Sequence, residues 1–306
     1  MASLATALHH MHGDVDPVWL MGSSAFAFRM NVSEVLCPSA MSVFDWSADL
    51  PEAVEQAGYA CNQIIRLWDE DSLEEERRSN AHAAILAGIG DGVPAVVWDI
   101  HDAEWGLVIG YDEERQTYTT LTNRGQTSSL SYDRLGHNGI DILSVTIPGK
   151  PNHRPREDAV RNSLIAAIAH AEGKEWTERP AYQNGLAGYD LWATVFERWA
   201  LLVEAGKAPK IPSDIPDRAA YYARHYYSAR CYAREYLRDA VKGSDDLGGA
   251  ARAYARAADS LRPVWEAFQQ TRSPSAELLR SMASNVRDAK TAEREALKHI
   301  ERHLAA

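Results

Sequence analysis

The strongest constraint on the fold is a change in composition near residue 150. Residues 156–304 are rich in Ala, Arg, Glu, Leu and Tyr, whereas residues 1–148 mix short apolar runs with turn residues. Breaks that contain Pro, Gly or Ser divide the second half into long segments, a pattern typical of a helical bundle. The expected helices cover approximately 156–172, 181–206, 215–242, 246–270 and 274–304.

The first half predicts helices followed by an antiparallel sheet. β-Branched and aromatic runs bounded by turn residues are typical of strands, and residues 112–115 are expected to connect two of them as a hairpin. This order of elements is that of an α+β fold. The expected helices cover about 23–34, 50–57 and 72–87, and the expected strands cover 93–100, 104–112, 116–123 and 141–148.

Three prolines between the halves predict a linker. Pro148, Pro151 and Pro155, together with Gly149, are expected to exclude regular structure there. The sequence therefore predicts two domains, an α+β domain at 1–150 and an all-α helical bundle at 151–306.

Charge and cysteine content exclude several classes of protein. The chain has 306 residues, of which 45% are apolar, and a formal net charge of −11. This composition excludes a disordered tail, and it argues against a nucleic-acid partner because phosphate neutralisation requires a basic face. Three scattered cysteines, Cys37, Cys61 and Cys231, form no disulfide framework, so a cytoplasmic location is expected. Neither a secretory signal, a membrane span nor a cofactor is expected, since the corresponding motifs are missing from the sequence.

Three motifs resemble a known group of proteins. The segment EWGLVIGYD ends in Gly110, Tyr111 and Asp112, and WLMGSSAFAFRM has the glycine and apolar spacing of a helix that carries a nucleophile. Both are similar to motifs of papain-like cysteine peptidases of the bacteriocin-processing C39 type and of the related butirosin-pathway acyltransferases. GLAGYDLWATVFERW, followed by HYYSARCYAREYLRDA, is similar to a helical extension of bacterial relatives of this group. The resemblance implies a papain-like fold for residues 1–150.

The resemblance also implies where a catalytic triad would lie, and two of its three positions differ from the family. The nucleophile position falls on Ser23 instead of cysteine, and the base position falls on Glu104 instead of histidine. The third position falls on Asn123, which matches the group that orients the base. A reactive thiolate requires a histidine within hydrogen-bonding distance. The set is therefore expected to be either an inactive triad or a binding site for a small ligand or partner on an inherited scaffold.

An active enzyme is the alternative hypothesis. Cys37 with His101, or Ser23 with Glu104, would then act on a small amide or thioester substrate as an amidase or acyltransferase. The proline after Cys37 also suits a buried cysteine at a turn, and His101 also suits an ordinary turn histidine. A third hypothesis is a non-enzymatic interaction module that assembles through the helical bundle, and the sequence leaves a homo-oligomer open.

Tryptophans near these positions are candidate ligand-binding residues. Glu104 is expected to face a groove, where desolvation would raise its pKa toward that of a general base. The same carboxylate could instead hold a cationic ligand against a ring of Trp19, Trp98 or Trp105. A glutamate at a strand edge in water is the alternative.

Tyr189 and Trp192 are three residues apart and share one face of an expected helix. Such a pair either belongs to the core or closes the cleft into a small-molecule pocket. The cluster His9, His10 and His12, with Asp14 and Asp16, contains residue types that bind metals. A histidine-rich turn that packs against the segment carrying Trp19 is the favoured interpretation of that cluster, so no metal site is predicted.

Overall fold

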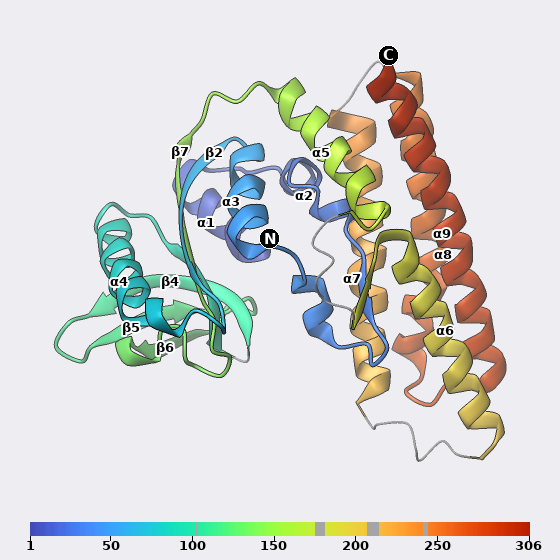
Figure 1. Cartoon of the computed structure of the whole chain (residues 1–306), viewed down its shortest axis with the longest axis horizontal. Coiled ribbons are helices and arrows are strands. Elements are labelled where there is room, and N and C mark those ends of the chain that lie inside the picture. Colours follow the sequence, from blue (N-terminus) through green and yellow to red (C-terminus); the bar gives the residue numbers. More distant parts are fainter. Residues whose placement is uncertain (102, 175–180, 207–213, 241–243) are drawn as a thin grey trace. The chain divides into compact units, whose positions relative to one another are not determined.

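The chain divides into two units in the computed structural model, which describes residues 1–101, 103–174, 181–206, 214–240 and 244–306 (Figure 1). Unit 1 comprises Met1–Leu20 and Asp45–Arg156, and unit 2 comprises Met21–Phe44 and Glu157–Ala306. Residues 21–44 thus pack with the C-terminal helices, whereas the sequence predicted a single boundary after residue 150. In the described part of the chain, no helix has the length and apolar character needed to span a membrane.

Unit 1 is built on an antiparallel sheet. Its strands are arranged in the order β2-β7-β3-β4-β5-β6. The expected hairpin joins β4 to β5, and the strands expected at 93–100, 104–112, 116–123 and 141–148 are all present with small changes at their ends. The strands are β2 (Tyr59–Arg66), β3 (Ala95–His101), β4 (Glu104–Asp112), β5 (Thr117–Leu121), β6 (Thr127–Ser131) and β7 (Leu143–Pro151).

Helices cover both faces of this sheet. Leu4 and Leu8 of α1 (Ala2–His12) pack with Val54 of α3 (Trp46–Gln56) against one face. Ile85 of α4 (Glu74–Gly90) packs against the other face. The side chain of Asp45 caps α3 by accepting hydrogen bonds from two main-chain N–H groups, which starts this helix earlier than the expected residue 50. Helices and an antiparallel sheet in one chain confirm the α+β class. Short 3₁₀ helices lie at η3 (Asp71–Leu73) and η4 (Tyr132–Arg134).

Unit 2 contains the five helices that the composition predicted. Helices α6 to α9 run side by side, with α8 between α7 and α9 (Figure 1). The helices are α5 (Arg156–Ala171), α6 (Gly185–Glu204), α7 (Ile215–Glu235), α8 (Asp245–Gln270) and α9 (Ala276–Ala305), and a π-helical turn, η6 (Tyr236–Ala240), follows α7.

The helix expected at 23–34 is absent from this region, and the prediction was wrong. Helix α2 (Pro17–Ser23) ends where that helix was expected to begin, and it is followed by η1 (Phe26–Phe28), β1 (Asn31–Ser33) and η2 (Pro38–Ser42). Ala25 adopts a left-handed conformation with φ of 61°, which ends the helical path. Strand β1 instead pairs with β8 (Tyr182–Asn184). Tertiary pairing therefore overrides local helix propensity here.

Buried side chains of unit 2 hold the main chain of residues 27–37. The guanidinium of Arg230 donates to the carbonyl of Arg29 at 2.8 Å. The N–H of Asn31 donates to the Tyr226 hydroxyl at 3.0 Å. In a helix these N–H and C=O groups would bond to other main-chain groups of the same helix. Here the side chains of Arg230 and Tyr226 replace those partners, so the extended backbone leaves neither of these two main-chain groups unpaired.

The linker predicted around Pro148 and Pro151 is also corrected. Strand β7 continues through Pro151, where it pairs with β2. The pairing of β7 with β3 involves Val145 and Thr146. Proline has no N–H to donate to a neighbouring strand, so it disrupts a strand that pairs on both sides. It is tolerated at the end of β7, where, among the described strands, only β2 pairs with it.

Candidate functional site

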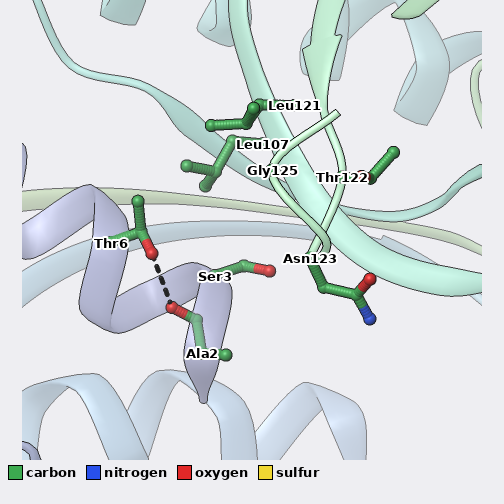
Figure 2. Close-up of a pocket in the computed structure, with 8 residues that line it drawn as sticks. All are labelled: Ala2, Ser3, Thr6, Leu107, Leu121, Thr122, Asn123 and Gly125. Carbon is green, nitrogen blue, oxygen red and sulfur yellow. Dashed lines mark hydrogen bonds between the residues drawn. The ribbon is translucent and has the colours of Figure 1, made fainter. Parts of the chain in front are cut away.

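A pocket lies on the face of the unit 1 sheet that α1 covers (Figure 2). Its volume is about 200 Å³, and it is bounded by the first turns of α1, by β4 and β5, and by the turn between β5 and β6. All of its lining residues belong to unit 1. They are Ala2, Ser3, Thr6, Leu107, Leu121, Thr122, Asn123 and Gly125.

The lining combines an apolar wall with uncharged polar groups. Leu107 and Leu121 are cross-strand neighbours on β4 and β5 and form the wall. Ser3, Thr6 and Thr122 contribute hydroxyl groups. None of the eight lining residues has an ionisable side chain, so the pocket offers packing and neutral hydrogen bonds to whatever it binds.

Two of the three hydroxyl groups already have partners within the chain. Thr6 Oγ1 donates to the carbonyl of Ala2 at 3.1 Å (Figure 2). Thr122 Oγ1 accepts from two main-chain N–H groups of its own turn, at 3.1 and 3.3 Å. Ser3 is 5% exposed, and its hydroxyl points toward the turn that carries Asn123. Within the described ranges no residue hydrogen-bonds this hydroxyl, and its oxygen is not among the side-chain atoms that are both unpartnered and closed off from solvent, so it is accessible to a ligand.

Three predicted site residues meet at the end of the sheet beside this pocket. His101 and Glu104 are cross-strand neighbours where β3 leads into β4. Asn123 Nδ2 donates to Glu104 Oε2 at 3.4 Å, and Asn123 also lines the pocket. His101 and Asn123 are exposed, and Glu104 is partly exposed. The positions that the resemblance assigned to the base and to its orienting group are therefore in contact with each other.

Backbone strain at Asp99 shapes this end of the sheet. Asp99 lies in β3 with φ of 56°, and its carboxylate accepts from the N–H groups of Ala103 and Ile140 at 3.1 and 2.7 Å. The register of β3 on β4 shifts between Val97 and His101. Such a bulge redirects the side chains beyond it. The carboxylate of Asp99 therefore holds Ala103, the residue before Glu104, in place.

Trp105 lies on the opposite face of β4 from Glu104, because successive side chains of a strand alternate. Trp105 packs on the α1 side together with Leu107. It forms a three-ring cluster with Trp46 and Trp98, with ring centroids 5.1–5.2 Å apart. Strand alternation thus separates the two side chains that the cation-site hypothesis combined.

Trp19 already has a cation of the same chain on its ring. The guanidinium of Arg156 lies 3.7 Å from the ring centroid. The indole Nε1 of Trp19 donates to the carbonyl of Ala57 at 3.1 Å. Both contacts lie within unit 1, so Trp19 joins Arg156, the first residue of α5, to Ala57, the residue that follows α3.

The two predicted nucleophiles belong to unit 2. Ser23 is the last residue of α2 and is 1% exposed, and its Oγ has no hydrogen-bond partner in the described part of the chain. Cys37 is half-buried, and its carbonyl accepts from the hydroxyl of Tyr222 at 2.8 Å. His101 and Glu104 belong to unit 1. Neither predicted nucleophile–base pair therefore lies within a single unit.

Tyr189 and Trp192 lie in the core of unit 2, and both are fully buried. The Tyr189 hydroxyl donates to the carboxylate of Glu293 and accepts from Arg230 Nε. Trp192 packs edge-on against Tyr226 with ring centroids 5.7 Å apart. Of the two interpretations of this aromatic pair, the core position is the one that these contacts describe.

The histidine-rich end of α1 is used in local contacts. His12 stacks on Tyr59 at 4.9 Å between ring centroids, and its Nε2 lies 3.2 Å from the carbonyl of Gly149. His9 Nδ1 lies 3.8 Å from a carboxylate oxygen of Asp14. Among the residues that the structure describes, no three His, Cys, Asp or Glu side chains are arranged to hold a metal ion.

Ser3 and Thr6, which line the pocket, are not among the site residues predicted from the sequence. A signal for Ser3 exists, because it is a polar residue on the buried face of α1 beside Leu4, Ala7 and Leu8. Buried serines are common at helix starts, so the sequence pattern alone does not indicate a pocket; the residues on the opposite wall are also needed.

No protein-family model and no curated protein sequence matches the chain.

The alkylation rates of the cysteines test whether a cysteine is a reactive nucleophile or has only a structural role. Burial, and next the nearby carboxylate of Glu55, raise the pKa of Cys61 to about 11. We expect iodoacetamide at pH 7.5 to alkylate Cys61 roughly 100-fold more slowly than free cysteine, because the thiolate is the reacting species. Peptide mass spectrometry over time measures this rate. Burial also raises the pKa of Cys231.

The unfolded chain provides the control, since all three thiols should react at similar rates in urea. Labelling of native Cys61 as fast as free cysteine would contradict the expected shift. The same time course reports on Cys37. Alkylation of Cys37 well above the rate of free cysteine would favour the enzyme hypothesis.

Proposed function

We propose that the chain is a degenerate relative of the papain-like cysteine peptidases, with Ser23 of unit 2 and Glu104 of unit 1 at the positions of the catalytic cysteine and histidine, and that unit 1 binds a small molecule in the pocket that Asn123 lines. The α+β organisation of unit 1, with helices on an antiparallel sheet, supports this proposal. The motif Gly110-Tyr111-Asp112 at the end of β4 supports it as well.

One observation carries the proposal: Asn123 both hydrogen-bonds Glu104 and lines the pocket. In a cysteine peptidase the corresponding amide orients a histidine that activates a thiol. Here the amide donates to a carboxylate, and the described residues of the pocket include no thiol. The arrangement can supply hydrogen bonds and an apolar wall, which suits binding rather than nucleophilic chemistry.

A pocket-filling substitution tests this function. Thr6 is exposed at the pocket rim, so Thr6→Trp should fill the pocket without disturbing the core of unit 1. We expect ligand-observed NMR with a mixed library of charged and neutral fragments to detect binders of the full chain. Thr6→Trp should weaken their binding at least tenfold.

His10→Trp is the matched control, because His10 is exposed on the same helix and does not line the pocket. This variant should bind like the unmodified chain. Fragment binding that survives Thr6→Trp unchanged would overturn the proposed function.

A further inference from the structure

Resting on the proposed function, we infer that the pocket takes a neutral, ring-sized molecule that carries one uncharged hydrogen-bonding group, such as a primary amide or an alcohol. The inference follows from three properties of the pocket: its volume, the lack of charged side chains in its lining, and the hydrogen-bond partners of its hydroxyl groups.

The volume sets the size of the ligand. A cavity of roughly 150 Å³ is enough to hold benzene, whereas sites for drug-sized molecules run from about 300 to 1,000 Å³. The pocket, at about 200 Å³, lies between these limits and nearer the lower one. It therefore fits one ring with a few additional heavy atoms, and it is too small for a nucleotide or an extended peptide.

The absence of charge from the lining selects a neutral ligand. An ionised group that leaves water requires an opposite charge or several hydrogen bonds in compensation. None of the eight lining side chains can provide a charge. Glu104 does not line the pocket, and the Asn123 amide that contacts it extends away from α1 (Figure 2).

The hydroxyl groups indicate where the ligand's polar group would bind. Thr6 donates its hydroxyl proton to the main chain and the Thr122 oxygen accepts from two main-chain N–H groups, whereas the Ser3 hydroxyl has no partner in the described ranges and belongs to a residue that is 5% exposed. In addition, no side chain caps the N-terminus of α1, so the N–H groups of its first turn favour an acceptor oxygen. A carbonyl or hydroxyl oxygen of the ligand can accept from these groups and from Ser3.

Four probes of nearly equal size test this inference on the full chain at pH 7. Benzamide is neutral and polar, benzoate is an anion, benzamidine is a cation and toluene lacks the polar group. We expect benzamide to bind at least tenfold more tightly than benzoate and benzamidine in NMR titrations. Ser3→Ala should weaken benzamide binding about tenfold and leave toluene binding unchanged, because it removes one hydrogen bond and no apolar wall.

The fold should tolerate Ser3→Ala, since the Ser3 hydroxyl has no hydrogen-bond partner among the described residues and its removal therefore breaks no hydrogen bond to them. An unchanged melting temperature therefore assigns any loss of affinity to the site. Equal or tighter binding of benzoate or benzamidine, or a Ser3→Ala variant that binds benzamide normally, would overturn the inference but not the proposed function. Failure of all four probes, with other fragments still sensitive to Thr6→Trp, would also overturn the inference alone. Insensitivity of every binder to Thr6→Trp would overturn both.

Discussion

Replacing Glu293 with glutamine should lower the free energy of unfolding of unit 2 by about 3–5 kcal/mol, the usual cost of leaving one member of a buried ion pair alone. Glu293 and Arg230 are both almost fully buried, and the guanidinium meets the carboxylate through two hydrogen bonds of 2.9 Å. Burial is the largest single influence on Arg230 and would lower its pKa, but Glu293, Tyr189 and Tyr254 together raise that pKa above the ordinary value. The arginine stays charged in the variant as well, because a guanidinium group is not deprotonated in proteins. Urea unfolding followed by far-UV circular dichroism measures the loss.

Glu295→Gln is the matched control, because Glu295 lies on the same helix and pairs with Arg256 at the surface. Exposed ion pairs contribute about 0–1 kcal/mol, so this substitution should change the unfolding midpoint little. Equal effects of the two substitutions would contradict the role assigned to the buried pair. Arg230 also donates to main-chain carbonyls of Ala27 and Arg29, so loss of its partner should loosen the segment that carries β1 as well.

The helices of unit 2 and four strands of unit 1 were predictable because their signals are local. Runs of apolar and charged residues ended by Pro, Gly or Ser predicted all five helices, although α6 begins after strand β8 and α7 ends at Glu235, before the expected residue 242, which lies outside the described residues. The hairpin of β4 and β5 was predictable for the same reason, since turn residues separate two β-branched runs. In these segments local preference and tertiary packing agree.

Residues 21–44 could not be predicted because their conformation is set by distant partners. Asn31 and Met30 are held by Tyr226 and His170, which lie 195 and 140 residues away in the sequence. The strand β2 and the prolines of β7 were missed for a related reason, since pairing of β7 with β2 permits Pro148 and Pro151 in a strand. Local propensity carries no information about such partners.

The candidate site was predictable in part. The resemblance singled out Glu104 and Asn123, and the structure joins them by a hydrogen bond. The pocket itself combines α1 with β4 and β5, which are about 100 residues apart in the sequence, so no local pattern could reveal it. The role proposed for Ser3 depends on a comparison that only the structure allows: Thr6 and Thr122 have hydrogen-bond partners for their hydroxyl oxygens, and Ser3 has none among the described residues.

Substituting Gly185 with alanine should destabilise unit 2 by about 3 kcal/mol or more. Gly185 begins α6 with φ of 55°, a conformation that costs a side-chain-bearing residue roughly 1–3 kcal/mol. A Cβ atom there would lie only 2.3 Å from the carbonyl oxygen of His170 and 2.5 Å from the Cα of Ala171. These are main-chain atoms, so no side-chain rotation relieves the clash, and overpacking adds a further cost of about 1–3 kcal/mol. Thermal and urea unfolding measure the combined effect.

Gly248→Ala provides a control with the opposite sign. Gly248 lies in α8, where an added Cβ would meet the side chain of Arg252 at an ordinary 3.6 Å. Alanine is favoured over glycine inside a helix by about 0.5–1 kcal/mol, so this variant should unfold at slightly higher urea concentration. The N–H of Gly185 donates to the carbonyl of Met30 at 2.8 Å, so the clash at Gly185 should also displace β1. A Gly185→Ala variant as stable as Gly248→Ala would show that α6 does not need glycine to approach α5 and β1.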